Sequence, residues 1–183
     1  MTNCMGLPEE SVDALRAHYL KTYGTTLRGL QHDYQIDADE YLAYVHDLPL
    51  NEYIQPDPGL RQMLLSLPLR RLIFTNADSN HARRVLATLE LQDCFQGIID
   101  VRAIGFLNKP DPLAYQRALD ISGVADPKAC VLLDDAAQNT EAARRLGFTT
   151  VLVNQEPHNG VADYQIPFVR DLPNALPGLW LGS

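Results

Sequence analysis

Two adjacent carboxylates are the residues whose types and position most directly suggest chemistry. Asp134 and Asp135 follow the apolar run at residues 131–133. Ionised side by side they repel each other, and a bound cation is the usual way to relieve that repulsion. Mg²⁺ prefers carboxylates, water and substrate phosphate as ligands. The pair therefore predicts a Mg²⁺ site with Asp134 and Asp135 as its protein ligands.

Three further polar residues could form the matching anion site. Thr75 and Asn76 follow the apolar run at 72–74, and Lys109 precedes a proline in a loop. A threonine hydroxyl with adjacent backbone N–H groups can hold a phosphate oxygen, and a lysine supplies compact positive charge for the same anion. Each residue alone has a plainer interpretation, as a helix cap or a solvated side chain. The ordered set with two carboxylates is more specific, and it predicts a phosphate site.

The segment around the carboxylates reads as strand, acidic turn, helix and strand. A helical pattern of Asn139, Ala142, Ala143 and Leu146 follows, and Gly147 stands where the helix would stop. A second apolar run follows at 149–153. Such a unit builds a parallel sheet covered on both faces.

The preceding segment repeats this alternation. We expect a strand at 72–74, a helix capped by Asp78 or Ser79, a strand at 97–101, and a helix capped by Asp111. The sequence thus predicts an α/β fold with a doubly wound parallel sheet. Ligands bind at the carboxyl ends of the strands in such sheets, so the polar residues above should converge on one rim.

The N-terminal third has a different character. Residues 1–57 read as helical: Pro8 starts a helix that Gly24 ends, and Asp37 or Asp39 opens another. A breaker of prolines and glycine at 56–59 marks the boundary, which gives a helical cap segment at 1–57 and an α/β core at 58–183. The tail from residue 157 reads as a wrapping segment with one short strand.

Composition excludes several classes of protein. The 183 residues carry a net charge of −8 and no Lys/Arg cluster, which argues against a nucleic-acid partner. No apolar run approaches the roughly 18 residues of a membrane helix, and no secretory signal opens the chain. Cys4, Cys94 and Cys130 are widely spaced and odd in number, as expected of reduced thiols in a cytoplasmic protein.

From Pro8 to about Leu172 the chain resembles the haloacid dehalogenase-like (HAD) phosphohydrolases, especially the pyrimidine 5′-nucleotidase-like branch with its helical cap. The second motif is matched by residues 72–76, the third by Lys109-Pro110, and the fourth by residues 132–135 followed by Asn139. The resemblance implies a small phosphate-ester substrate. It also implies that Thr75, Asn76 and Lys109 bind the phosphoryl group, and that Asp134 and Asp135 hold Mg²⁺.

The family's first motif is missing from the sequence. That motif is a strand ending in Asp-x-Asp, which supplies the nucleophile and the general acid/base and precedes the cap. Asp37-Ala38-Asp39 has the spacing but follows polar residues, so we interpret it as a helix cap. The chain is therefore expected to be an N-terminally truncated member without the aspartyl-phosphate route, with one metal ligand fewer, and without the central strand of the sheet.

The absent strand leads to an expectation about the sheet. The strands at 72–74 and 131–134 would face a gap with unpaired backbone groups, which are costly when buried. We expect these two strands to close up and pair, with a homodimer covering the exposed apolar surface. The alternatives are that another segment of the chain, or a second copy, fills the gap.

Two functions remain open at this stage. The first is a hydrolase of phosphate esters in which a metal-bound water replaces the lost nucleophile, with Thr75, Lys109, Asp134 and Asp135 as catalytic residues. His81 is a candidate proton carrier in it, and classical nucleotidase activity should be weak or lost. The second is a catalytically silent domain that acts as a dimeric interaction module. A phosphorelay receiver has the same residue types in the wrong order, because Lys109 precedes Asp134.

Overall fold

The computed structural model describes residues 9–158 and 160–181. The chain divides into two compact units at the Leu48–Pro49 bond, whereas the sequence analysis placed the boundary after residue 57. The short helix α5 (Leu50–Tyr53) accounts for the earlier position, because it contacts α7 (Ser79–Thr88) of the second unit. Among the described helices, none combines the length and apolarity needed to span a bilayer.

The first unit consists of helices α2 (Glu9–Tyr23), α3 (Thr26–Tyr34) and α4 (Ala38–Val45). The expected start at Pro8 lies outside the described residues. Asp37 caps α4, because its Oδ1 accepts hydrogen bonds from the backbone N–H groups of Asp39 and Glu40. The capping interpretation of residues 37–39 is therefore confirmed. The sequence analysis did not identify α3 as a separate helix.

A close approach of two helices forms the core of this unit. The Tyr19 ring of α2 is fully buried against Gly29 of α3. A Cβ atom at position 29 would lie 2.2 Å from the Tyr19 ring, so only glycine fits there. The Tyr19 hydroxyl donates a 2.8 Å hydrogen bond to Asp33. Burial is the largest cause that raises the pKa of Tyr19 to about 12, and this hydrogen bond is the second.

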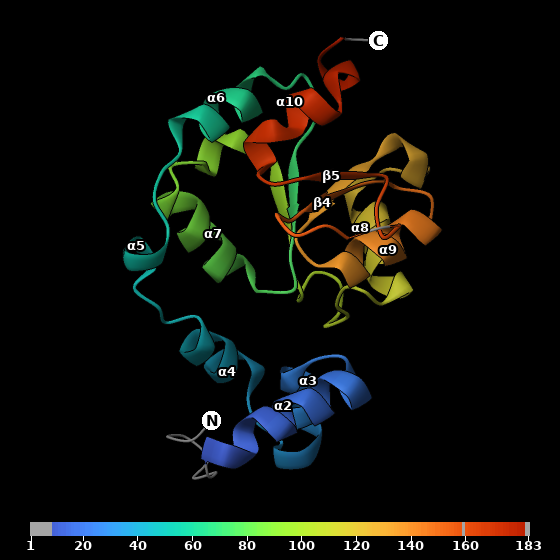
Figure 1. The fold of residues 1–183 in the computed structure, drawn as a ribbon. Coiled ribbons are helices and arrows are strands. Elements are labelled where there is room, and N and C mark those ends of the chain that lie inside the picture. Colours follow the sequence, from blue (N-terminus) through green and yellow to red (C-terminus); the bar gives the residue numbers. More distant parts are fainter. Residues whose placement is uncertain (1–8, 159, 182–183) are drawn as a thin grey trace. The chain divides into compact units, whose positions relative to one another are not determined.

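The described part of the second unit has five short strands, each parallel to its partners: β1 (Leu72–Phe74), β2 (Gly97–Ile99), β3 (Val131–Asp134), β4 (Thr149–Val153) and β5 (Tyr164–Ile166). Figure 1 labels β4 and β5. The predicted strands at 72–74, 131–134 and 149–153 and the short tail strand are confirmed. The strand predicted at 97–101 ends earlier, because Asp100 begins a turn in which its Oδ1 accepts a hydrogen bond from the N–H of Ala103.

After α5, the described helices of this unit are α6 (Pro58–Ser66), α7, α8 (Pro112–Ser122), α9 (Ala137–Arg145) and α10 (Leu172–Ala175), with 3-10 turns η1 (Gln92–Cys94), η2 (Pro127–Ala129), η3 (Val169–Asp171) and η4 (Pro177–Trp180). Three of these helices, α6, α7 and α8, have an aspartate as their N-cap residue, whereas α9 and α10 have no side-chain cap. Asp78 and Asp111 cap α7 and α8 as expected. Gly147 follows α9 with a φ of 98°, a conformation that glycine adopts without strain.

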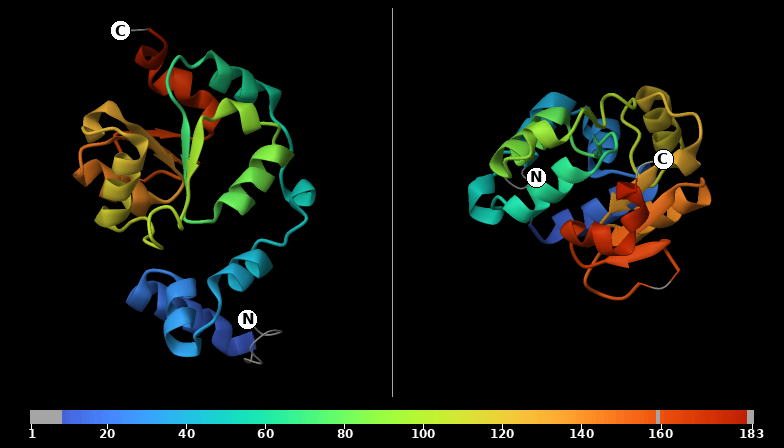
Figure 2. Two further views of the ribbon diagram at one scale, coloured as in Figure 1. Left: turned by 180° about the vertical axis from the view of Figure 1, so that it is seen from behind. Right: turned by 90° about the horizontal axis from the view of Figure 1, so that it is seen from above.

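Strand β1 sends alternate side chains into two hydrophobic cores. Ile73 packs against the larger core, which includes Met63 of α6, Leu86 of α7 and Val151 of β4. Leu72 and Phe74 pack against the smaller core, whose buried residues are Ile99, Ile104, Ala114 and Ala118. Figures 1 and 2 show α7 and α8 on opposite sides of β1 and β2. The layers are those of an α/β fold.

The strands do not form one continuous sheet. β1 pairs only with β2, while β3, β4 and β5 form a separate three-stranded sheet. The expectation that the strands at 72–74 and 131–134 close up and pair is therefore wrong. No strand of the described chain lies between them. The α/β class with parallel strands is confirmed, but the doubly wound sheet is divided into two parts.

Candidate active site at the carboxyl ends of β1 and β3

Lys109 connects the two sheets at the carboxyl ends of their facing strands. Its Nζ lies 2.9 Å from the carbonyl oxygen of Phe74, the last residue of β1. The same Nζ lies 2.5 Å from Oδ2 of Asp134, the last residue of β3. Both side chains are buried. A buried ion pair is costly to break, because removal of one partner leaves an uncompensated charge.

Asn76 fixes the backbone of Lys109. The Asn76 side chain accepts a 2.8 Å hydrogen bond from the Lys109 N–H and donates a 3.0 Å bond to the Lys109 carbonyl. Asn108 donates a further bond of 3.1 Å to that carbonyl. The ammonium also lies 4.9 Å from the centre of the Phe74 ring, within range of a cation–π interaction. Lys109 is thus held at both its main chain and its charged end.

Asp134 accepts hydrogen bonds with both carboxylate oxygens. Besides Lys109 on Oδ2, its Oδ1 accepts from the Ala136 N–H at 3.0 Å and from the Asn139 side-chain amide at 2.9 Å. Asn139 is positioned in turn by Tyr115, whose hydroxyl donates to the Asn139 carbonyl at 2.8 Å. Burial, together with the Asp134 charge, raises the pKa of the Tyr115 phenol. Tyr115 therefore remains a protonated hydrogen-bond donor at neutral pH.

The predicted site residues are brought together to different degrees. Hydrogen bonds join Asn76, Lys109 and Asp134 directly. Thr75 is their chain neighbour and is partly buried, but its N–H bonds to Ile99 in the sheet and cannot serve an anion. The Thr75 Oγ1 accepts from the Ala77 N–H at 3.0 Å, which leaves the hydroxyl proton available. Asp135 is exposed, and its carboxylate makes no hydrogen bond or ion pair within the described chain.

His81 lies in the first turn of α7, which follows the Thr75–Asn76 loop. Its side chain is partly buried. Burial lowers the pKa of His81, against an opposing effect of the Asp78 charge. A lowered pKa favours the neutral imidazole, which can accept a proton.

Two polar groups at the carboxyl ends of the strands were missed by the sequence analysis. Asp100, directly after β2, is buried and accepts a 2.8 Å hydrogen bond from the Ser79 N–H at the start of α7. An acidic residue immediately after an apolar strand was the signal that could have identified it. The second is the carbonyl of Phe74, which binds Lys109. Because it is a backbone group, the side-chain types in the sequence cannot predict this contact.

The side-chain oxygen atoms at and near Asp134 are of the type that Mg²⁺ takes as ligands. Within residues 9–158 and 160–181 there is no group of three or more His, Cys, Asp or Glu side chains suited to a metal. The oxygen donors present are the carboxylates of Asp134 and Asp135. A third is Oδ1 of Asn139, which is buried without a hydrogen-bond partner. Carboxylate and amide oxygens are hard ligands of the type that Mg²⁺ takes, usually with water.

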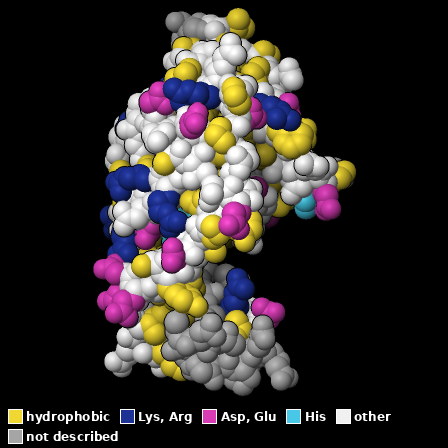
Figure 3. Space-filling view, turned by 90° about the vertical axis from the view of Figure 1, so that its left-hand side faces the viewer, with side chains coloured by type: hydrophobic (Ala, Val, Ile, Leu, Met, Phe, Trp, Pro, Cys, Tyr) yellow, Lys and Arg dark blue, Asp and Glu magenta, His cyan; other side chains and the backbone are white. Residues whose placement is uncertain are grey.

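The charged side chains on one face of the molecule are of both signs. On the face shown in Figure 3, basic and acidic side chains are interspersed. The net charge of the whole chain is −8.

Parallel strands with a buried lysine and two aspartates at their carboxyl ends are the arrangement expected of a haloacid dehalogenase-like hydrolase, and comparison with known proteins supports this class. The haloacid dehalogenase-like hydrolase family matches residues 8–147, and the chain belongs to that family. Phosphate metabolism protein 8 of Saccharomyces cerevisiae is 32% identical over 162 residues, which cover 81% of this chain and 50% of that protein. The chain thus spans about half the length of this curated relative.

Solved structures share the fold at low sequence identity. L-2-haloacid dehalogenase from Xanthobacter autotrophicus matches with a TM-score of 0.63 and 18% identity, over 93% of this chain and 83% of that one. A HAD phosphatase from Thermococcus onnurineus matches with a TM-score of 0.63 and 20% identity, over 94% and 83% of the respective chains. These similarities support the fold assignment.

Proposed function

We propose that this chain is a HAD-like hydrolase that acts on small phosphate esters. The observation that carries the proposal is the Lys109 ammonium, which is fixed between the Asp134 carboxylate at the end of β3 and the carbonyl of Phe74, the residue before Thr75. A fixed cation and a hydroxyl donor at the carboxyl ends of parallel strands suit a phosphoryl group. The yeast relative's name, which refers to phosphate metabolism, and the phosphatase with the same fold support this choice.

Each residue has a role that follows from its contacts. Lys109 uses two of its three N–H groups on Phe74 and Asp134, so the third is available to a phosphate oxygen. The Thr75 hydroxyl would donate to a second oxygen, and Asn76 would keep Lys109 in place. When bound by Asp134 and Asp135, Mg²⁺ would supply positive charge that neutralises the phosphate oxygens.

The finer assignment, also a proposal, is the pyrimidine 5′-nucleotidase-like branch without the first motif. The supporting observation is that Asp37 and Asp39 take part in the start of α4 rather than ending a strand. A chain without the Asp nucleophile would hydrolyse mononucleotides weakly or not at all. Residual hydrolysis would use water as the nucleophile, and the neutral imidazole of His81 is the candidate proton acceptor.

The test is hydrolysis of p-nitrophenyl phosphate with Mg²⁺, with EDTA, and by the Asp135→Ala variant. We expect EDTA and Asp135→Ala each to lower the rate by about 100-fold or more, because each removes charge stabilisation from the reacting phosphate. Lys128→Ala removes an exposed charge from η2 and serves as a matched control with unchanged rate. Hydrolysis that survives both EDTA and Asp135→Ala would place the chemistry elsewhere.

A silent interaction module, acting as a homodimer, is the second candidate. It is favoured by the buried ion pair of Lys109 with Asp134, because two opposite charges that compensate each other can hold two sheets together without binding a ligand. A chain of this kind would neither turn over the ester nor bind inorganic phosphate in a calorimetric titration. Sedimentation at micromolar concentration tests the dimer, and a clean monomer would exclude it.

A further inference from the structure

The turn at residues 100–106 leads from the end of β2 toward Lys109, and it holds an aromatic side chain in an unusual backbone conformation. We propose that Phe106 of this turn is a specificity-determining residue, which selects phosphate esters whose leaving group carries an aromatic ring. This role rests on the proposed function, because it takes the phosphoryl group to lie at Lys109 and Thr75. Phe106 would contact the part of the substrate that those two residues do not hold.

Hydrogen bonds attach the turn to the candidate active site near both of its ends. The Val101 N–H donates a 3.2 Å hydrogen bond to the carbonyl of Ala77. The N–H of Ala77 in turn donates to the Thr75 hydroxyl oxygen. Beyond the other end, Asn108 is buried and donates to the Lys109 carbonyl. The turn therefore lies beside the residues that would bind the phosphoryl group.

The turn is also fixed from within. The buried carboxylate of Asp100 accepts hydrogen bonds of 2.8 Å from the N–H groups of Ser79 and Ala103. The side chain of Ile104 is buried in the smaller hydrophobic core. A side chain on a fixed turn can contact a ligand with little loss of conformational freedom, which favours binding.

Phe106 has a backbone conformation that is costly for a bulky residue. Its φ is 59°, in the left-handed region that such residues rarely adopt. Glycine adopts this region without strain, as Gly105 does with a φ of 74°. Packing does not offset the strain, because neither hydrophobic core of the described residues includes Phe106, whereas Ile104 and Leu107 pack in the smaller core. Strained residues of this kind cluster at functional sites.

The surroundings of the Phe106 ring indicate which chemical group it would contact. The residue is only partly buried, so part of its surface is accessible to a ligand. Because a fully extended chain rises by about 3.3–3.6 Å per residue, its Cα atom lies at most about 11 Å from that of Lys109. The guanidinium carbon of Arg102 lies 5.8 Å from the ring centre, within range of a cation–π interaction, and disfavours a second cation there. A second aromatic ring suits this position, since two rings attract each other in offset-stacked or edge-to-face arrangements.

The test compares the binding of two phosphonates to the full chain by calorimetric titration in the presence of Mg²⁺. Phenylphosphonate carries an aromatic ring and methylphosphonate does not. Neither contains a phosphate ester bond, so binding is measured without turnover. We expect the wild type to bind phenylphosphonate about tenfold more tightly, because the ring contact adds to the phosphoryl contacts that both probes share.

Three variants test whether Phe106 is the source of this preference. Phe106→Leu should reduce it to about twofold or less and leave the affinity for methylphosphonate unchanged. Phe106→Tyr retains an aromatic ring and should retain the preference. Phe168→Leu is the matched control, because Phe168 is exposed and has the Arg170 guanidinium 4.6 Å from its ring centre. It should keep the full preference.

Phe106→Gly separates a functional role from a structural one. Glycine removes the ring and the backbone strain together. The variant should lose the preference for phenylphosphonate while its urea midpoint stays close to that of the wild type. A large fall in the midpoint would assign the ring a structural role and would contradict a role in specificity.

The outcomes distinguish this role from the proposed function. Equal wild-type affinities for the two phosphonates, or a preference that survives Phe106→Leu, would overturn the role of Phe106 and leave the hydrolase standing. Binding of neither phosphonate would overturn both. A preference that depends on Phe106, without any turnover of p-nitrophenyl phosphate, would support the role of Phe106 and count against hydrolysis alone.

Discussion

Replacement of either Lys109 or Asp134 should greatly lower the free energy of unfolding of the second unit. Only 9% of the Lys109 side chain and 5% of the Asp134 side chain are exposed, so each charge depends on the other for compensation. Replacement of one partner leaves the other buried and unpaired, at a cost of about 3–5 kcal/mol of unfolding free energy. Against a total stability of roughly 5–15 kcal/mol for a domain, that is a large loss.

The two single variants should differ from each other. In Lys109→Met the Asp134 carboxylate retains two donors, the Ala136 N–H and the Asn139 amide. In Asp134→Leu the ammonium retains the Phe74 carbonyl and ring. A carboxylate with two donors is better compensated than an ammonium with one acceptor. Asp134→Leu should therefore be the more destabilised of the two.

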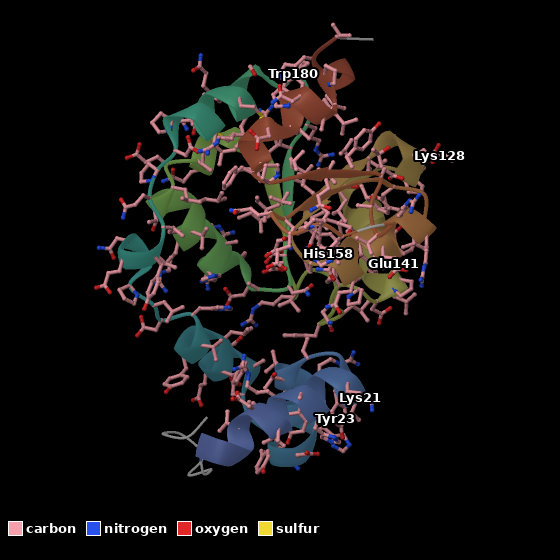
Figure 4. All side chains as sticks on the ribbon, viewed as in Figure 1. Lys21, Tyr23, Lys128, Glu141, His158 and Trp180 are labelled. Carbon is pink, nitrogen blue, oxygen red and sulfur yellow. The ribbon has the colours of Figure 1, made fainter. Side chains whose placement is uncertain are left out.

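The double variant Lys109→Met/Asp134→Leu should be more stable than the sum of the single losses predicts. No charge remains buried in it, and the two apolar side chains can pack together. We expect a coupling energy of up to about 3 kcal/mol between the two positions. The stabilities of the wild type, the two single variants and the double variant are measured by urea unfolding, with the fluorescence of Trp180, the single tryptophan, as the probe. Trp180, which is labelled in Figure 4, belongs to the same unit and donates a hydrogen bond to Ser66.

An exposed ion pair on α9 is the matched control. Glu141 (Figure 4) pairs with Arg145 one turn later, with side chains 44% and 76% exposed. Its removal should cost only about 0.3–0.5 kcal/mol. If the losses at Lys109 and Asp134 were additive within about 0.5 kcal/mol, or no larger than at this control pair, the reasoning from burial would be refuted.

Two further predictions concern packing and pH. Gly29→Ala should destabilise the first unit by about 1–3 kcal/mol in a thermal melt, because the new methyl group overlaps the Tyr19 ring; Gly178→Ala, which meets open space, should be neutral. Burial acts to raise the pKa of Asp163, but hydrogen bonds led by those from Thr150 lower it below its usual value. The ionised carboxylate then stabilises the fold above the unfolded-state pKa of about 3.9, and this contribution disappears as the pH falls through the folded-state pKa. Asp163→Asn should therefore lose about 1–3 kcal/mol at pH 7, and the difference from wild type in urea melts should close in acid; a pH-independent difference would contradict this account.

Local signals predicted most elements of the second unit. Continuous apolar runs identified β1, β3 and β4, and Asp111 followed by Pro112 marked the start of α8. The runs succeed because a strand covered on both faces needs apolar side chains at every position. The strand at 97–101 was predicted too long, because the Asp100 carboxylate accepts hydrogen bonds from the N–H groups of Ser79 and Ala103 and begins a turn, which the apolar pattern does not indicate.

Pairing between strands was not predictable in the same way. Apolar runs indicate that β1 and β3 are interior strands, but not which strands lie beside them. The expected direct pairing rested on the cost of unpaired backbone, and the structure instead connects the strands through Lys109. The sequence placed Asn76, Lys109 and Asp134 on one rim. It gave no indication that Lys109 and Asp134 bind each other, because a contact 25 residues apart depends on the tertiary fold.

Because β1 directs its side chains into two different cores, the connection between α6 and β1 must keep its length. Ile73 faces one core and its two neighbours face the other, so an insertion or deletion of one residue between α6 and β1 would exchange the two sets. Arg71 adds a second restraint, because its guanidinium donates to the carbonyl of Cys94 at 2.6 Å just before the strand. Changes of length should therefore be tolerated far less in this connection than in the exposed loop after β4.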